Sequence, residues 1–459
     1  MSPLSGTALP SILVPPPGPR SRALAAELAR WESPNVTYLA DDFPVFWEAA
    51  RVANVLDADG NVYVDLTAAF AVAGVGHGHP RVVDAIQRQS ATLLHGMGDV
   101  HPPALKVELL RALAQAAPGA LNRSVLASSG AEAVEAALKT AMMATGKPRV
   151  LAFHGSYHGL TYHALSVSGR EDFRAPFAAQ LASSAVFAPY PYAYRSPFGR
   201  DAEEVTAATL RYVEHVLDTP GSASEAIGAI LVEPIQGRGG DVVPAGGFLP
   251  GLRRICDERG LLLILDEIYT GFGRTGRWFA CEHWGVVPDV LIVGKGLTGV
   301  FPFSACIGTD AVMDAWPRST GEALHTSTFL GHPVGCAAAL ASMAVLRDER
   351  LVERSARLGA RIQDRLREMT MDHPHVGEVR GRGMMIGMEM VRDRGSRAPA
   401  PELAGRVVVE GLRRGVLLLG GGIHGNVLSF SPPFVITEEQ VDFALGVIGE
   451  ILEGMRASA

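Results

Sequence analysis

Two apolar, strand-like runs in the middle of the chain each end beside one ionisable residue. Residues 261–265 lead directly into Asp266, and residues 290–293 are followed after one glycine by Lys295. Desolvation at the end of such a run disfavours the ammonium form, so we expect a lowered pKa and a nucleophilic amine at Lys295. A lysine of this kind can form a Schiff base with an aldehyde. A carboxylate at a neighbouring strand end can pair with a pyridinium nitrogen, so the two residues predict a site for pyridoxal 5'-phosphate (PLP).

A serine-glycine segment at the start of a predicted helix is a candidate seat for the phosphate. Ser128, Ser129 and Gly130 follow the strand-like residues 124–127 and precede a helix-like stretch over residues 131–144. The free N–H groups of a helix start, with hydroxyls beside them, bind phosphate. An ordinary N-cap by Ser129 would explain the same residues without a ligand. Next to the lysine and aspartate, we favour the phosphate seat.

Two further strand ends carry polar residues. Residues 153–159 (FHGSYHG) could stack an aromatic ring on a planar cofactor. The spacing of His154 and His158 also resembles metal ligation, but glycines interrupt the segment and no Cys or Asp cluster accompanies it, so we predict no metal. Glu233 ends the run 227–232, where it could cap the strand, bond the cofactor or steer Arg380 or Arg274.

Residues 271–276 (GFGRTG) match the glycine pattern of dinucleotide sites. Five residues separate this pattern from the preceding strand-like run, and no long helix is predicted after it. We therefore interpret the segment as a loop that shapes the cofactor site or a subunit boundary.

The bulk composition excludes several classes of protein. The chain has 459 residues, a net charge of −7 and no dense Lys/Arg run, so we expect two or three domains and no nucleic-acid partner. The four cysteines are scattered without a CxxC pair, which favours a reducing compartment over a disulfide framework or zinc site. We expect neither a membrane span nor a signal peptide, and predict a cytoplasmic enzyme.

From about residue 80, helical periodicity alternates with short apolar runs. Helix-like stretches are residues 82–94, 104–116, 131–144, 203–217 and 250–258, and strand-like runs are 124–127, 149–153, 227–232, 261–265 and 290–293. This rhythm predicts an α/β fold with a mostly parallel sheet and helices on both faces. We predict a large cofactor domain over residues 76–345. Residues 346–459 would form a smaller α+β domain, joined by residues 1–75 with a hairpin over 52–66.

The Pro/Ser/Gly-rich residues 1–20 are expected to be mobile or draped over a partner.

Seven short motifs, in one order along the chain, carry a resemblance to a known family. They are residues 128–139 (SSGAEAVEAALK), 157–159 (YHG), 233–237 (EPIQG), 266–276 (DEIYTGFGRTG), 294–296 (GKG), 326–333 (TSTFLGHP) and 432–433 (PP). From about Pro44 to its end, the chain resembles the class III (subgroup II, ω-type) PLP-dependent aminotransferases of fold type I.

The resemblance implies roles for individual residues. Lys295 would hold PLP and carry a proton, and Asp266 would keep the pyridine nitrogen protonated. The cofactor-binding set would be Ser129, Gly130, Ala131, Tyr157, His158, Glu233, Asp266, Ile268, Lys295 and Thr328.

Within that set, Tyr157 would stack on one ring face and Ile268 would pack against the other. Glu233 would help to place Asp266. Thr328 would reach the phosphate of a neighbouring subunit, which implies a homodimer or a dimer of dimers. Many relatives have a glutamine that contacts the ring hydroxyl where this chain has Tyr269.

The chain departs from the family pattern where substrates are recognised. Arginines of carboxylate-reading relatives are absent from residues 420–433, and Leu160 stands where some relatives have one. The predicted pocket residues Phe46, Trp47, Phe70 and Leu160 are apolar. Because bidentate arginines normally read carboxylates, recognition of the 4-aminobutyrate kind is not expected, unless Arg238 serves instead.

The leading prediction is an aminotransferase that moves an amino group between an amino acid or amine and a 2-oxo acid, aldehyde or ketone, with ping-pong kinetics. An amino-acid racemase or epimerase, or a PLP-dependent lyase, would use the same cofactor motifs and stays an alternative. The presence of both Lys295 and Asp266 argues against a non-catalytic binding protein.

Overall fold

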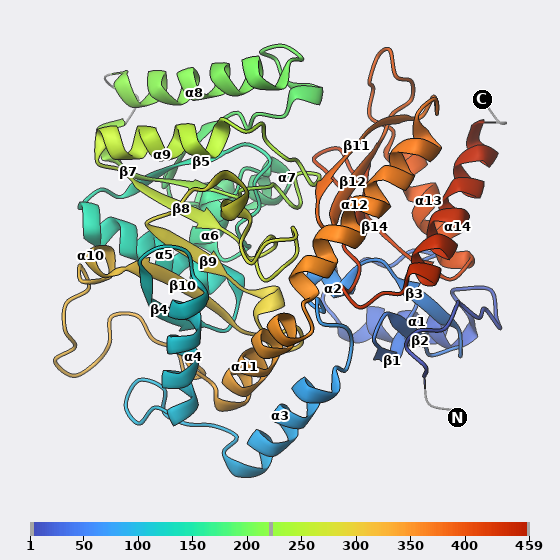
Figure 1. Cartoon of the computed structure of the whole chain (residues 1–459), viewed down its shortest axis with the longest axis horizontal. Coiled ribbons are helices and arrows are strands. Elements are labelled where there is room, and N and C mark those ends of the chain that lie inside the picture. Colours follow the sequence, from blue (N-terminus) through green and yellow to red (C-terminus); the bar gives the residue numbers. More distant parts are fainter. Residues whose placement is uncertain (1–3, 220–223, 457–459) are drawn as a thin grey trace. The chain divides into compact units, whose positions relative to one another are not determined.

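The computed structural model describes residues 4–219 and 224–456, which fall into two compact units. One unit combines the chain up to Pro80 with the chain from Arg354 onward, and the other is Arg81–Glu353. Figure 1 colours both units along the sequence. No helix among the described residues is long and apolar enough to cross a membrane.

The unit Arg81–Glu353 is built on a seven-stranded sheet with the strand order β4-β10-β9-β8-β7-β5-β6. Its strands are β4 (Leu121–Ala127), β5 (Arg149–Phe153), β6 (Ala185–Ala188), β7 (Ile227–Val232), β8 (Leu262–Asp266), β9 (Val290–Val293) and β10 (Ser304–Thr309). The pairs from β6 through β5, β7, β8 and β9 are parallel, whereas β10 is antiparallel to both β9 and β4. The predicted α/β fold with a mostly parallel sheet is confirmed.

The helices of this unit precede, separate and follow its strands along the chain. They are α3 (Pro80–Thr92), α4 (Ala104–Ala116), α5 (Gly130–Thr145), α6 (Tyr162–Val167), α7 (Glu171–Arg174), α8 (Ala202–Asp218), α9 (Phe248–Arg259), α10 (Asp310–Met313) and α11 (Pro333–Asp348), with short 3-10 turns η1 (Ala175–Gln180), η2 (Ala193–Arg195), η3 (Ser224–Ala226), η4 (Ala280–Trp284) and η5 (Lys295–Leu297). The connection through α5 crosses the sheet in one direction, and those through α8 and α9 return in the other. Right-handed crossovers therefore place α5 on one face and α8 and α9 on the opposite face.

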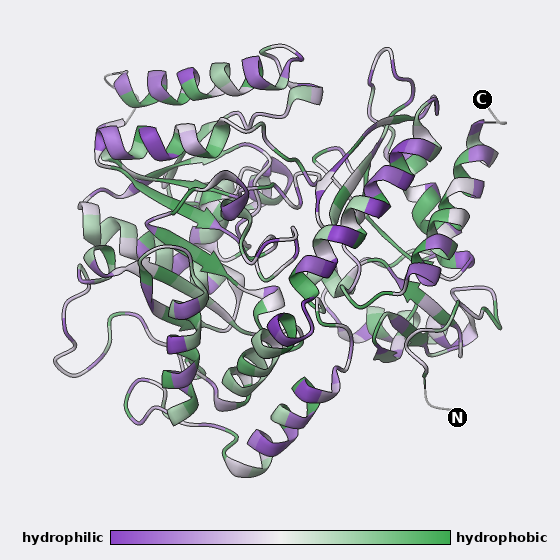
Figure 2. Cartoon of the chain, viewed as in Figure 1, coloured by the Kyte–Doolittle hydropathy of each residue, from purple (hydrophilic) through white to green (hydrophobic). Residues whose placement is uncertain are grey.

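Burial explains why the central strands are continuous apolar runs. Every residue of β7 and β9 is buried, and the central strands are green in the hydropathy colouring of Figure 2. Helix α5 covers one side with alanines, which allow its backbone to lie close to the sheet. The Ser129 hydroxyl accepts from Glu132 N at the start of α5, and Gly146 ends the helix in the left-handed region with φ +68°.

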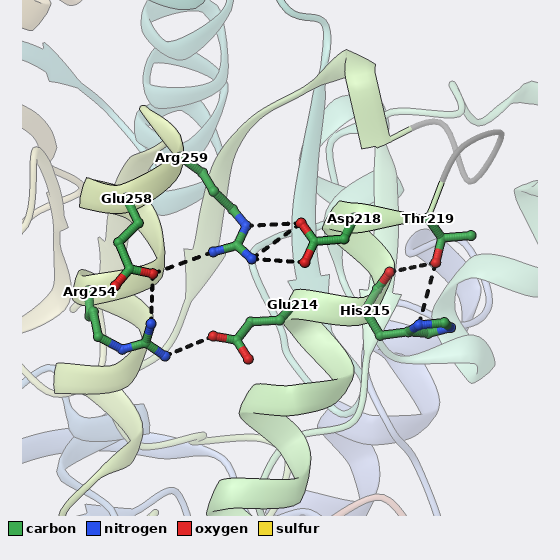
Figure 3. A network of polar contacts seen from close by, with 7 residues as sticks. All are labelled: Glu214, His215, Asp218, Thr219, Arg254, Glu258 and Arg259. Atoms are coloured by element: carbon green, nitrogen blue, oxygen red, sulfur yellow. Dashed lines mark hydrogen bonds and ion pairs between the residues drawn. The ribbon is translucent and has the colours of Figure 1, made fainter.

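Helices α8 and α9 are joined by a surface network of charged side chains, drawn in Figure 3. Arg254 pairs with Glu214 at 2.8 Å and with Glu258 at 2.7 Å, and Arg259 pairs with Asp218 at 3.0 Å. Exposed pairs of this kind contribute roughly 0–1 kcal/mol each. The network therefore holds two outer helices together and takes no part in the chemistry.

The other unit contains two four-stranded sheets. The first has the order β1-β2-β3-β13 and the second the antiparallel order β11-β12-β15-β14. The strands are β1 (Trp47–Arg51), β2 (Asn54–Asp57), β3 (Val62–Asp65), β11 (Val376–Arg382), β12 (Met385–Met390), β13 (Val416–Leu417), β14 (Leu419–Gly421) and β15 (Val427–Phe430), and the helices are α1 (Pro19–Trp31), α2 (Ala68–Ala71), α12 (Leu351–Thr370, which begins in the other unit), α13 (Pro401–Arg413) and α14 (Glu438–Arg456). Strands β2 and β3 form the predicted hairpin around Asp59 and Gly60.

The segment α2 is a left-handed turn, because φ lies between +44° and +64° at all four of its residues. Such a conformation costs roughly 1–2 kcal/mol per L-residue. Polar contacts hold it in place. Thr67 donates to Asp65 at 2.6 Å and accepts from Ala69 N, and His77 bonds Asp65 at 2.8 Å. The turn leaves the Phe70 side chain exposed on this unit.

The described part of the N-terminal segment packs on its own unit, which corrects the expectation of a mobile segment. Ser11 bridges to Val62, and Leu13 N and Val14 N both donate to the Asn61 side chain. Residues 1–3 of the predicted segment lie outside the described residues. The prediction failed because buried Asn61 supplies an acceptor for a proline-rich chain that cannot form a regular ladder.

Candidate functional site

Lys295 and Asp266 lie at adjacent strand ends, as predicted. Strands β8 and β9 pair in parallel with Asp266 opposite Ile292, and Glu267 N donates to Ile292 O at 2.8 Å. Lys295 follows three residues later as the first residue of η5, with φ +42°. The carboxyl ends of parallel strands meet at one edge of the sheet, so both side chains belong to the same edge.

The environment of Lys295 favours its neutral amine. Desolvation lowers the pKa of Lys295 to about 8, although the negative charges of Asp266 and Glu233 oppose that change. The Nζ atom lies 4.1 Å from the ring centroid of Tyr269. Within the described part of the chain, Nζ has no hydrogen-bond or ion-pair partner. The predicted fall in the pKa of this lysine is confirmed.

Asp266 is held by two different groups. Its Oδ2 lies 2.7 Å from His158 Nδ1, and its Oδ1 accepts from Ile268 N at 3.1 Å. Both side chains of the Asp266–His158 pair are buried. His158 Nε2 is buried without a partner among the described residues. The histidine therefore fixes the orientation of the carboxylate and leaves a polar atom at the sheet edge.

Glu233 ties two loops of the site together through backbone amides. Its Oε1 accepts from Tyr157 N and its Oε2 from Gly237 N, both at 2.9 Å. Burial is the main reason that the pKa of Glu233 rises to about 7, while the positive charge of His158 opposes the rise. Among the roles considered from the sequence, these contacts correspond to the cap at the end of a strand, because the carboxylate accepts hydrogen bonds from backbone amides.

The predicted phosphate seat packs against the other site residues. A Cβ on Gly130 would come within 2.9 Å of the Ile268 side chain, and one on Gly159 within 2.6 Å of Ala131. The Ser304 hydroxyl donates to Ser129 O at 2.6 Å. The start of α5 therefore lies against both Ile268 and the Tyr157–Gly159 turn.

Two of the remaining predicted residues are exposed, and three belong to the other unit. Thr328 is exposed, in a loop where Thr326 bonds Asp99 at 2.8 Å, and Leu160 is also exposed. Phe46, Trp47 and Phe70 belong to the unit that contains the chain ends, where the Trp47 ring meets His77 edge-on.

The glycine pattern at residues 271–276 and the pair His154 and His158 each have a clear local structure. The segment 271–276 forms tight turns rather than a helix start, as expected. His154 stacks on Phe187, whereas His158 bonds Asp266. The two histidines thus have separate partners.

Ser304 and Tyr269 lie next to site residues, and the sequence did not predict the contacts that they make. Ser304 belongs to β10, whose short run of small residues gave no strand signal. The Tyr269 ring, at the position where many relatives have a glutamine, lies beside Lys295 Nζ. Only the pairing of β9 with β10 and the loop after β8 bring these residues to the site.

The family model described as "Aminotransferase class-III" matches residues 37–452. The chain belongs to the class III aminotransferases. Members of this family transfer amino groups between amino donors and carbonyl acceptors with PLP, so this chain is a PLP-dependent transaminase. The aminotransferase predicted from the sequence is confirmed at this level.

Several known aminotransferases and related proteins are similar over nearly their whole length. The acetylornithine aminotransferase of Methanosarcina acetivorans is 39% identical over 405 residues, covering 88% of this chain and 91% of that protein. The alanine/serine racemase of Pyrococcus horikoshii is 33% identical over 443 residues, covering 96% and 92%. The PLP-bound amine transaminase from an uncultivated Pseudomonas species has a TM-score of 0.85 and 30% identity, covering 93% of this chain and 98% of that one.

The donor set of this aminotransferase fits PLP. The desolvated Lys295 amine suits an aldehyde, Asp266 suits a pyridinium N–H, and the glycine at position 130 lets the helix start pack closely against Ile268. The buried His158 Nε2 adds a polar atom whose partner the described chain does not supply. These residues would hold the cofactor in the family manner.

Proposed function

We propose that Lys295 is the catalytic base and acid of a ping-pong transamination, with Asp266 and Tyr157 as its partners at the cofactor. The observation that carries the proposal is the half-buried Lys295 amine, which has no polar partner among the described residues and whose pKa lies near 8 beside the Asp266 carboxylate. Bound PLP would supply an electron-withdrawing ring that stabilises negative charge at the substrate Cα. An amine whose pKa lies within about one unit of neutral pH can both take up and return a proton.

The other residues would position and shield the reacting atoms. Asp266, oriented by His158, would hold a proton on the ring nitrogen, and Tyr157 and Ile268 would enclose the ring. Ser129, Gly130 and Ala131 would bind the phosphate through the N–H groups at the start of α5. Glu233 would keep Tyr157 in place through the amide contact at 2.9 Å.

The proposed enzyme is a homodimer or a dimer of dimers, to which Thr328 contributes across the interface. The exposure of Thr328 supports this assignment. Residues 76–345 would be the cofactor domain. The four free cysteines, all buried, agree with a cytoplasmic location.

A panel of amino donors tests the proposal. The enzyme is mixed with α-amino acids, ω-amino acids, diamines or arylamines in the absence of an acceptor, and the cofactor absorbance is followed. Stoichiometric conversion to pyridoxamine phosphate with at least one donor is expected. Ammonia release without that conversion would contradict transamination as the main reaction.

Amino-acid racemisation is a second candidate, and the similarity to the Pyrococcus horikoshii alanine/serine racemase is the observation that favours it. Both reactions need a group that moves a proton at Cα, so Lys295 would serve in either. Optical inversion of alanine or serine without loss of the amino group, and without pyridoxamine phosphate, would identify a racemase.

A further inference from the structure

Arg238 stands at the same edge of the sheet as Lys295. It follows Gly237, whose N–H donates to Glu233 at the end of β7, and β7 pairs with β8. The positive charge of Arg238 contributes to the low pKa of the Lys295 amine. The guanidinium and the amine therefore act within one electrostatic environment.

The guanidinium of Arg238 has aromatic neighbours but no acidic partner. Its Cζ lies 4.6 Å from the ring centroid of Tyr157 and 5.7 Å from that of Phe173. Among residues 4–219 and 224–456, no side chain or carbonyl accepts a hydrogen bond from it. By contrast, nearby Arg170 is paired with Asp172 through two hydrogen bonds of 2.9 and 2.7 Å.

The loop that carries Arg238 is fixed by its backbone. Arg170 donates to Arg238 O at 3.0 Å. Gly240 N and Asp241 N both donate to Gly237 O, at 2.9 and 3.0 Å. A cation on a fixed loop, exposed and with free donors, is prepared for an anion that arrives with a ligand.

We propose that Arg238 binds the carboxylate of the amino donor and of the oxo-acid acceptor, so that the substrates are amino acids rather than simple amines. The inference rests on the transamination proposed above and names its substrate class. A planar guanidinium with five donors can hold a carboxylate through two hydrogen bonds, while the aromatic rings keep its plane in place. Arg238 would thus replace the arginines that the sequence lacks at 420–433.

A purely structural role, in which Arg238 only buttresses the Tyr157 ring, would give a different result. In that case, removal of Arg238 would weaken cofactor binding and affect all donors equally. Matched donors with and without a carboxylate separate the two roles. Alanine and isopropylamine are such a pair, because a methyl group replaces the carboxylate.

The first measurement is single-turnover conversion to pyridoxamine phosphate by the holoenzyme. For Arg238→Gln, we expect kcat/KM with alanine to fall by about 10–100-fold, the range of hydrogen bonds to charged groups, and kcat/KM with isopropylamine to change less than about threefold. Arg238→Lys keeps the positive charge but lacks the planar guanidinium. Its kcat/KM with alanine should lie between those of the parent and Arg238→Gln. Arg211→Gln, an exposed arginine on α8, is the control and should match the parent with both donors.

The second measurement is calorimetric binding of propionate, which has a carboxylate but no amino group. The parent and Arg211→Gln should bind it at least tenfold more tightly than Arg238→Gln. Equal losses with alanine and isopropylamine, or propionate binding that is absent from the parent or unchanged in Arg238→Gln, would overturn the assignment. If no donor yields pyridoxamine phosphate, the proposed transamination fails, while propionate binding still decides the role of Arg238.

Discussion

Two buried clusters of ionisable side chains, one in each unit, are organised in opposite ways. In the unit that contains the chain ends, Arg380 pairs with Glu389 at 2.7 Å and with Glu378 at 2.9 Å. Asn426 also donates to Glu389, at 3.3 Å. In the other unit, Lys295 lies at the same sheet edge as Asp266 without pairing with it.

The difference shows how burial can serve either structure or chemistry. Arg380 is paired with two carboxylates, so its buried positive charge is compensated within the protein without a ligand. At the second cluster, Asp266 is bonded by His158 and Glu233 by backbone amides, which leaves the Lys295 amine desolvated and without a polar partner in the described chain. A desolvated amine without a polar partner costs stability, and such groups are concentrated at sites where they can react.

Removal of the lysine should have the largest effect. Lys295→Ala is expected to lower amino transfer by about 10⁴-fold or more, the upper range for one positioned acid–base group, and to remove the Schiff-base absorbance with PLP. Single-turnover kinetics and absorbance spectra provide the measurements. Lys147→Ala, at the start of β5 and thus at the opposite sheet edge, should leave both unchanged. A Lys295→Ala enzyme that kept the Schiff-base absorbance would refute the assignment.

Removal of Arg380 should instead lower stability. Arg380→Ala leaves buried Glu389 without its cation, so the free energy of unfolding should fall by about 3–5 kcal/mol. Urea unfolding monitors this change, and the activity of the folded enzyme should persist. Arg361→Ala, which removes exposed pairs with Glu438 and Asp442 on the same unit, should cost less than about 1 kcal/mol. Similar losses for the two variants would mean that the Arg380 cluster is not a structural one.

The smallest effect concerns the protonation of Lys295. A pKa near 8 means that the amine of the cofactor-free enzyme is mostly neutral above pH 8. An ordinary lysine, with a pKa of 10.5, is still mostly protonated at that pH. Labelling by an amine-reactive reagent, read by mass spectrometry against Lys147, should therefore reach half its maximum near pH 8. Because the Asp266 charge favours the ammonium form, Asp266→Asn should move the midpoint lower, and Arg238→Gln should move it higher.

A midpoint near pH 10.5 in the unmodified enzyme would show that the amine is solvated. The two clusters would then not differ in the way described above.

Local patterns predicted much of the larger unit because its strands are buried on both faces. Residues 149–153, 227–232 and 290–293 were predicted as strands with the bounds found in β5, β7 and β9. The run 104–116 was likewise predicted as the helix α4. Strands β6, β10 and β11 and helix α13 were missed. Pairing with neighbouring strands stabilises β6, β10 and β11, which local preference did not identify.

What the sequence determined without any structure is the chemical inventory: a lysine and an acid after buried strands, a serine-glycine helix start, and seven motifs in one order. These signals can be recognised in the sequence alone because strands, caps and turns depend on residues that are close together along the chain. Partnerships between distant residues could not be read in this way. Asp266 and Glu267 are adjacent carboxylates, yet the first meets His158 and the second accepts from Ala280 N and Cys281 N. Likewise, the sheet order decides which strand ends become neighbours, so only the folded loop after β7 places Arg238 over Tyr157, with no acid among the described residues to pair with it.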